Sequence, residues 1–128
     1  MEKIENGFVN EELGIKLNIF REDGREWFKA QDISEFLNYR MTSDMTRSLR
    51  INDEHIRRVK LRSSRGNTYE AVFLDENALY EVLLFVRKTD IERYEKARKL
   101  YTWIVNDIIP VLDLRTNIKL NRIFGKTK

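Results

Sequence analysis

The chain has 128 residues, enough for one domain with a filled hydrophobic core and too few to leave much room for a second. A composition of 41% hydrophobic and 35% charged residues is typical of a soluble folded domain. With no cysteine and one histidine, disulfide scaffolds, thiol catalysis and Cys/His zinc sites are excluded, and we expect no metal and no cofactor. The N-terminus lacks an apolar signal core and no run approaches the roughly 20 apolar residues that span a bilayer, so we expect an intracellular protein without a membrane partner.

The first third of the chain predicts short strands. Residues 14–20 alternate apolar and polar side chains, which is the period of a strand with one solvated face. Asp23 and Gly24 form a pair that accepts positive φ in a tight hairpin turn, so the next strand should begin near Trp27. A further strand is expected near residues 7–9.

Two short helices are expected next. The apolar face of the first reaches Leu37, and Asn38 follows where a helix often stops in the left-handed conformation. Thr42 or Ser43 can cap the second helix. Its buried stripe is expected from three residues at four-residue steps, Met41, Met45 and Leu49.

A basic hairpin and two longer helices complete the predicted elements. Residues 59–62 and 68–73 predict two strands joined by a polar, positively charged loop. Asp75 should cap a helix with the apolar face Leu79, Val82, Leu83 and Val86. Asp90 should begin another, with the apolar positions Ile91, Tyr94, Tyr101, Ile104 and Ile108. Pro110 lacks an amide donor and should end or kink that helix.

These elements predict an α+β fold, in which small N-terminal antiparallel strands and a β-hairpin pack with several short helices and a longer C-terminal helix. We expect the domain to occupy residues 1–112 and to be followed by a basic tail at 113–128. The tail can continue as an amphipathic helix through Leu114, Ile118 and Leu120. With Leu112, it is a candidate contact for a homodimer.

The net charge of +3 conceals an uneven distribution along the chain. Residues 1–39 and 70–112 have net charges of −4 and −2, whereas residues 40–69 carry eight basic and three acidic side chains and residues 113–128 carry five and one. Seven of the eight central basic residues are arginine, whose planar fork binds phosphate bidentately and reads the guanine edge. The central segment therefore favours nucleic-acid contact, and the alternative is a solvated surface whose arginines pair with carboxylates elsewhere.

Three blocks of residues carry a more specific pattern. In residues 27–39 a Trp-Phe strand end leads into a short helix closed by Leu-x-Tyr, residues 73–84 begin a helix after Phe-Leu-Asp-Glu-Asn, and residues 97–110 run from a Leu-Tyr-Thr-Trp helix to a proline. In this order and spacing, the blocks resemble the N-terminal domain of the BRO family (Bro-N) over about residues 8–112. The resemblance implies nucleic-acid binding and a viral or bacteriophage origin, because the family occurs in large DNA viruses of insects and in bacteriophages. Family members are often fused to a different C-terminal domain and often described as antirepressors. The protein would then act in the host cytoplasm for a phage or prophage, or in the host nucleus or cytoplasm for a eukaryotic virus.

Two functional hypotheses follow. The first is a module that binds double-stranded DNA in gene regulation, with Arg47 and Arg50 on the polar side of the second short helix and Arg62 and Arg65 beside the hairpin loop. The full set of predicted contacts is Arg40, Arg47, Arg50, Arg57, Arg58, Lys60, Arg62 and Arg65, with possible secondary contacts from Arg115, Lys119 and Arg122. The second is an antirepressor that binds a repressor protein through the same arginines.

Other chemistry-bearing residues have structural interpretations. Four aromatic residues on apolar faces are assigned to the core rather than to base stacking: Trp27, Phe28, Tyr80 and Trp103. His55 follows Asp53 and Glu54 on an expected loop and is interpreted as a surface residue rather than a metal ligand or acid–base group. Asp32 and Glu35 are interpreted as a capping or solvated pair. No constellation of residues supports an enzyme.

Overall fold

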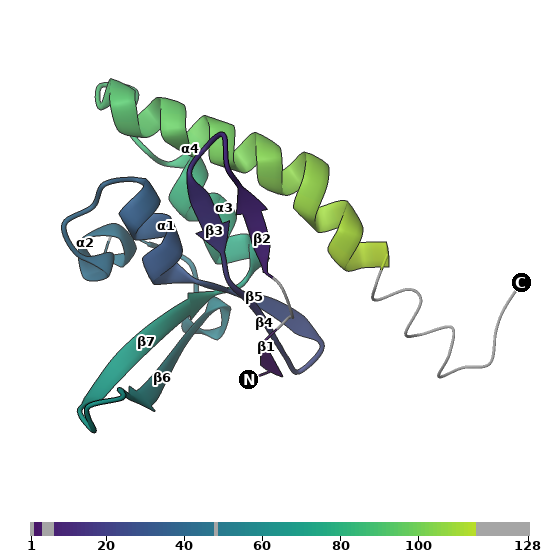
Figure 1. Ribbon diagram of the computed structural model, residues 1–128. Coiled ribbons are helices and arrows are strands. Elements are labelled where there is room, and N and C mark those ends of the chain that lie inside the picture. The colour runs from purple at the N-terminus through teal and green to yellow at the C-terminus, as the bar shows by residue number, and fades with distance from the viewer. Residues whose placement is uncertain (1, 4–6, 48, 115–128) are drawn as a thin grey trace, which may run out of the picture.

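Antiparallel strands and helices make up the computed structural model, which describes residues 2–3, 7–47 and 49–114 (Figure 1). The strands are β1 (Glu2–Lys3), β2 (Phe8–Asn10), β3 (Ile15–Leu17), β4 (Ile19–Glu22), β5 (Arg25–Lys29), β6 (Ile56–Arg62) and β7 (Thr68–Leu74). The helices are α1 (Ala30–Phe36), α2 (Thr42–Thr46), the 3₁₀ turn η1 (Asp53–His55), α3 (Glu76–Leu84), α4 (Ile91–Trp103) and the π-helical turn η2 (Ile104–Ile108). This arrangement confirms the predicted α+β class.

Five strands form one antiparallel sheet in the order β1-β4-β5-β7-β6, and β2 and β3 form a separate two-stranded ribbon. The turn between β4 and β5 contains Asp23 at φ 55° and Gly24 at φ 73°, which confirms the predicted hairpin. The strand expected near residues 7–9 is β2, and it pairs with β3.

The segment predicted as one strand at residues 14–20 belongs to two sheets. β3 pairs with β2, β4 pairs with β5, and Asn18 separates them. The backbone N–H of Asn18 and its side-chain Nδ2 both donate to Oδ2 of Asp32 on α1, at 2.8 and 3.0 Å. Because that N–H is bonded to a side chain, it does not join a strand ladder, and the pairing partner changes at this residue.

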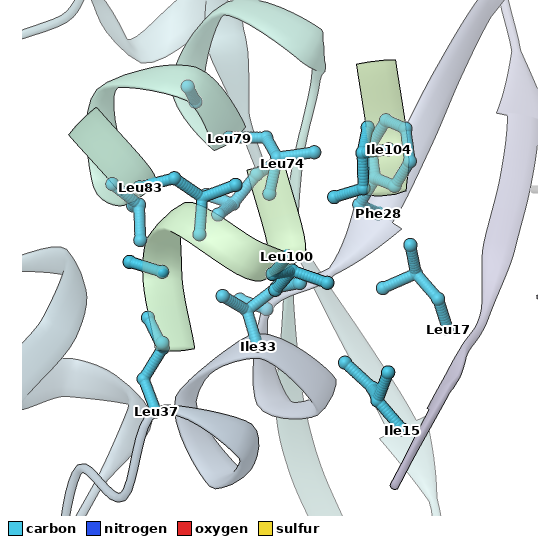
Figure 2. Packing of buried hydrophobic residues seen from close by; sticks show 14 of the residues in the cluster. Ile15, Leu17, Phe28, Ile33, Leu37, Leu74, Leu79, Leu83, Leu100 and Ile104 are labelled. Atoms are coloured by element: carbon cyan, nitrogen blue, oxygen red, sulfur yellow. The ribbon is translucent and has the colours of Figure 1, made fainter. Parts of the chain in front are cut away.

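The main hydrophobic core lies between the sheet and the helices α1, α3 and α4 (Figure 2). Phe28 of β5, Ile33 of α1 and Leu100 of α4 are fully buried in it. Asp75 caps α3 as predicted, because its Oδ1 accepts from the N–H of Ala78 at 3.0 Å. The predicted apolar face of α3 is confirmed by the burial of Leu79, Val82, Leu83 and Val86.

The aromatic residues assigned to the core differ in burial. Trp27 and Phe28 are fully buried, whereas Tyr80 and Trp103 are half-buried and pack against the edge of the core. Along α4 and η2 the buried positions are spaced three or four residues apart, at Ala97 and Leu100 of α4 and Ile104 and Ile108 of η2. Ile91 falls outside this spacing and is exposed, so its predicted place on the apolar face is wrong.

The second short helix, α2, is shorter than its predicted apolar stripe. Neither Thr42 nor Ser43 caps it through a side chain, and Thr42 Oγ1 instead lies 3.0 Å from Ser34 Oγ on α1. Met45 is buried, but Met41 precedes the helix in extended backbone and is exposed. Leu49 also packs against the main core, but it lies beyond α2, which ends at Thr46. The predicted cap and the place of Met41 in the buried stripe are therefore wrong.

Pro110 does not end the last helix. The π-helical turn η2 follows α4 directly, and residues 109–114 continue as a helix. A π-helical turn is wider than an α-helical one, and it accommodates the proline that can neither donate an N–H nor sit close to the preceding carbonyl.

The residues after Pro110 lie partly in the core of the chain itself. Leu112 is buried against the main core, although it was predicted as a dimer contact, whereas Leu114 is exposed. Ile118 and Leu120 lie outside the described residues, so the helical or dimerising tail stays a prediction. No helix in the described part of the chain is long and apolar enough to cross a bilayer.

Candidate nucleic-acid interface

The hairpin of β6 and β7 projects from the body of the molecule, away from α3 and α4 (Figure 1). Its ladder runs from Ile56 opposite Leu74 to Arg62 opposite Thr68. β7 pairs with β5 at Phe73 and Leu74 alone, so within the described residues β6 is the one ladder partner of residues 68–72. We call residues 58–72 the arm. The whole β6–β7 hairpin is longer than predicted, since β6 begins at Ile56 rather than near residue 59.

One face of the arm carries a row of three exposed cations, which we call the basic row: Arg58, Lys60 and Arg62. Side chains alternate across a strand, so the three lie on one face at intervals of roughly 7 Å. Glu70 lies opposite Lys60 on this face, and its Oε1 is 4.0 Å from Nε of Arg58. The row keeps a net positive charge beside this single carboxylate.

The basic row points to the side of the sheet on which α1 and α2 lie. Ile56 and Val72 share its face and pack against the main core, which contains Ile33 of α1. A small hollow of about 60 Å³ separates Thr42 of α2 from Glu70 and Val72 of β7. The start of α2 and the basic row therefore lie on the same side of the sheet.

The tip of the arm is a turn with one further arginine. Ser63 donates its N–H to the carbonyl of Asn67 at 2.7 Å, and its Oγ accepts from the N–H of Asn67 at 3.2 Å. Gly66 adopts φ 87°, a conformation that L side chains rarely adopt. These bonds close the loop and leave Arg65 exposed at its end.

Arg57 directly precedes the arm, and its side chain lies on the opposite face of β6 from that of Arg58. Its guanidinium forms ion pairs with Glu22 and, at 3.3 Å, with Asp23, both in the hairpin of β4 and β5. It also lies 4.8 Å from the ring centroid of Trp27, and its side chain is 31% exposed. Arg57 therefore fixes the base of the arm to the body and does not extend the basic row.

A second arginine packs on Trp27 and connects it to the cap of α3. The guanidinium of Arg25 lies 4.6 Å from the ring centroid of Trp27 and donates to Oδ2 of Asp75 at 3.0 Å. His55 Nδ1 lies 2.6 Å from the same Oδ2, and the side chain of His55 is 19% exposed. The interpretation of His55 as a surface residue is therefore wrong, because its ring contacts the buried carboxylate of Asp75.

The arginines around α2 lie apart from the basic row. Arg40 and Arg47 both contact Asp44, with Nε of Arg40 at 3.6 Å. Arg47 is the C-terminal cap residue of α2, and Arg50 lies beyond the helix, so the prediction that both occupy its polar side is wrong. The backbone N–H of Arg50 donates to the carboxylate of Glu81 on α3, at 3.1 and 3.2 Å to its two oxygens.

The eight predicted contacts thus lie in five places: the basic row, Arg65 at the tip, Arg40 and Arg47 beside Asp44, Arg50 beside α3, and Arg57 beside Trp27. Their role in DNA binding stays a prediction. The possible secondary contacts Arg115, Lys119 and Arg122 lie outside the described residues.

One feature of the surface was missed by sequence reasoning. Phe85 follows α3, is 73% exposed, and lines a hollow of about 970 Å³ together with Arg50 and Arg87. The signal was the sequence Phe85-Val-Arg87-Lys, which puts an aromatic side chain beside two cations.

Comparison with protein families gave one match that covers most of this architecture. A family described as the BRO family, N-terminal domain, matches residues 16–110, about three quarters of the chain. The matched range contains the three blocks of residues on which the resemblance rests, and it includes the whole arm. No curated protein and no solved structure gave a match.

Proposed function

Since the chain belongs to the BRO family through its N-terminal domain, we propose that it is a module that binds duplex DNA in viral or bacteriophage gene regulation, with the arm as its main contact. The family is associated with DNA-binding and antirepressor-like regulators. The observation that carries the proposal is the basic row on a projecting two-stranded ribbon.

The shape of the arm fits a groove of the double helix. The major groove is about 12 Å wide and admits a two-stranded β-ribbon. With the ribbon in or along a groove, Arg58 and Arg62 reach phosphate oxygens, and their planar forks bind them through two hydrogen bonds. Arg65 at the tip reaches further along the same path.

The salt dependence of binding tests the proposal most directly. We compare the double variant R58Q/R62Q with K16Q/K99Q, a control that removes two exposed cations from β3 and α4, outside the arm. Removing one phosphate contact should reduce the slope of log K against log salt by about 0.9, so the slope should fall by roughly 2 in the arm variant and by much less in the control. Fluorescence anisotropy with a random-sequence labelled duplex, from 50 to 300 mM salt, measures both slopes.

The competing role for these cations is protection of a sheet edge. β6 is an edge strand, and charged side chains on such a strand discourage pairing with another chain. If that is their only role, R58Q/R62Q should self-associate in light scattering and keep the parental slope for DNA. That result would overturn the proposal.

An acidic repressor surface is the alternative partner for the basic row. The observation that favours it is the same set of exposed arginines, in a family that includes antirepressor-like regulators. The antirepressor hypothesis predicts essentially no complex with random duplex at any salt concentration, whereas DNA binding predicts a complex with a steep slope.

We also propose that binding, rather than catalysis, is the activity. The single histidine lies against Asp75, whose carboxylate at the same time accepts from Arg25 and from the N–H of Ala78. These side chains are therefore used to cap α3 and to hold Arg25 against Trp27. Turnover of a nucleic-acid substrate by the purified protein would contradict this part of the proposal.

A further inference from the structure

A large hollow lies on another part of the surface, where the end of α3 and the start of α4 meet the segment after α2. Its volume is about 970 Å³, and Phe85 forms part of its wall. Phe85 is 73% exposed, more than any other large hydrophobic side chain in the described part of the chain, whereas Phe28 is fully buried. An exposed aromatic ring among arginines is the arrangement on which unpaired bases stack.

The charged side chains that line the hollow differ in whether they already have a hydrogen-bond or ion-pair partner. Arg93 donates to Asp90 at 2.7 Å and to the carbonyls of Leu37 and Asn38 at 2.9 and 3.2 Å. It also lies 3.9 Å from the ring centroid of Tyr39. These contacts leave neither Arg93 nor Asp90 available as the principal group for a ligand.

Asp44, the other carboxylate of the lining, contacts Arg40 and Arg47. The guanidinium groups of Arg50 and Arg87, by contrast, have no hydrogen-bond or ion-pair partner among the residues that the structure describes. The hollow therefore offers two unpaired cations beside one exposed aromatic ring.

We propose that this hollow binds a nucleotide unit, whose base stacks on Phe85 and whose phosphate is held by Arg50 and Arg87. Two guanidinium groups bind an anion such as phosphate, and an aromatic ring stacks on a flat base. A nucleotide carries a phosphate and a base in one molecule. An apolar protein segment would cover Phe85 but leave two cations unpaired. The unit comes either from a free nucleotide or from an unpaired position in a strand.

The site is separate from the arm, because Phe85 and Arg87 follow α3 and Arg50 follows α2. The inference therefore goes beyond duplex binding, and each can fail without the other. Loss of the hollow should leave the salt slope for duplex DNA unchanged, and loss of the basic row should leave nucleotide binding unchanged.

The experiment uses the full chain and three probes: AMP, inorganic phosphate and a labelled single-stranded oligomer of twelve deoxyadenosines. Stacking contributes about 1–3 kcal/mol per base, so Phe85→Ala should weaken binding of the bound probe by roughly 5- to 100-fold. R50Q/R87Q should weaken it and reduce its salt slope. Ile91→Ala removes an exposed apolar side chain outside the hollow and K16Q/K99Q removes two distant cations, and both should bind as the parent does.

The probes also distinguish the source of the nucleotide. Binding of AMP in the low-micromolar to millimolar range indicates a free nucleotide, whereas binding of the oligomer alone indicates a strand. Phe85→Leu separates stacking from simple apolar contact, because leucine keeps apolar area but has no π face; we expect its affinity to fall nearly as far as that of Phe85→Ala.

Three results would overturn the inference. One is binding of neither AMP nor the oligomer, and another is unchanged binding by folded Phe85→Ala. The third is loss of oligomer binding in R58Q/R62Q alone, which would place single-stranded DNA on the arm and leave the proposed duplex function standing. Phe85 is exposed, so circular dichroism should show that its variants are folded.

Discussion

Arg57 and Arg58 are neighbours in the sequence and have the same side chain, yet they lie on opposite faces of β6. Arg57 packs on Trp27 and pairs with the β4–β5 hairpin, whereas Arg58 belongs to the exposed basic row. The difference arises from the period of two of a strand, which sends successive side chains to opposite faces. A count of basic residues adds the two together, although one holds the base of the arm to the body and the other is exposed, with Glu70 at 4.0 Å from it.

The two faces also differ in what lies beneath them. Behind Arg57 is a small second core of Trp27, Ala71 and Phe73, with Phe20 and Phe73 in edge-to-face contact at 5.0 Å between ring centroids. The cations of the basic row, by contrast, are exposed. We therefore expect substitutions on the first face to change stability and substitutions on the second to change binding.

The largest expected effect is that of Trp27→Ala. Trp27 is fully buried, two guanidinium groups lie against its ring, and its Nε1 donates to the carbonyl of Glu22 at 3.3 Å. Truncation of a buried aromatic side chain lowers the free energy of unfolding by about 3–5 kcal/mol. Urea denaturation measures this decrease, and a change below about 1 kcal/mol would contradict the second core as the support of the arm.

A direct contrast comes from Arg57→Gln and Arg58→Gln. The first removes a half-buried ion pair and a contact with Trp27, so we expect a decrease of roughly 1–2 kcal/mol in unfolding free energy, after allowance for partial solvent exposure. The second is a surface change and should stay within about 0.5 kcal/mol. Denaturation of both variants, beside DNA titrations in salt, gives the stability and binding effects separately.

The expected pattern is reciprocal. Arg58→Gln should reduce the salt slope by about one unit, and Arg57→Gln, measured where it is fully folded, should keep the parental slope. Equal changes of slope in the two variants would mean that the faces do not have different roles.

Local features of the sequence predicted the parts of this comparison that depend on local interactions. The Asp23-Gly24 turn and the Asp75 cap were both predicted because each depends on residues within three positions of one another. The faces of Arg57 and Arg58 were not, since the predicted strand began near residue 59 and left both outside any alternation. The link from Arg25 to Asp75 joins residues fifty positions apart, and no sequence period reports such a contact.

The sequence predicted which type of residue makes up the candidate site, but not which of these residues lie together. The arginine-rich segment was visible in the charge count, but Arg50 and Arg57 leave the basic row for different reasons. Because α2 ends at Thr46, Arg50 lies beyond the helix and lines the hollow beside Phe85. Arg57 lies on the other face of β6, where it packs on Trp27. The first reason is the early end of α2, and the second is the alternation of side chains along β6, which fixes the face of Arg57 once the start of the strand is known.

A smaller effect is expected from Asp44→Asn. Asp44 is the shared partner of Arg40 and Arg47, so its neutralisation frees two cations beside the start of α2. If these arginines supplement the basic row, DNA affinity should rise by a few-fold at low salt and the gain should disappear at high salt. Unchanged affinity at low salt would confine the interface to the arm.

The smallest expected effect is a change of stability with pH that leaves the charge of the basic row unchanged. Burial raises the pKa of Asp32 above its ordinary value of 3.8, against the opposing effect of its hydrogen bonds from Asn18. The folded protein therefore binds this proton more tightly than the unfolded chain does. The contribution of Asp32 to stability is complete below about pH 3.8 and is lost as the pH rises through the raised pKa of the folded state. Arginine stays protonated throughout, so the salt slope for DNA should not follow this change.

Asp32→Asn isolates that contribution. In urea denaturation from pH 4 to pH 7, the stability of the parent relative to the variant should fall with rising pH and then become constant, because asparagine does not titrate. A relative stability that rises with pH would mean that the bonds from Asn18 outweigh burial and hold the carboxylate charged. In either case the slope of DNA binding against salt should be the same at pH 5 and pH 7 for parent and variant, since Asp32 lies on α1, against the β3–β4 junction, and the basic row lies on the arm.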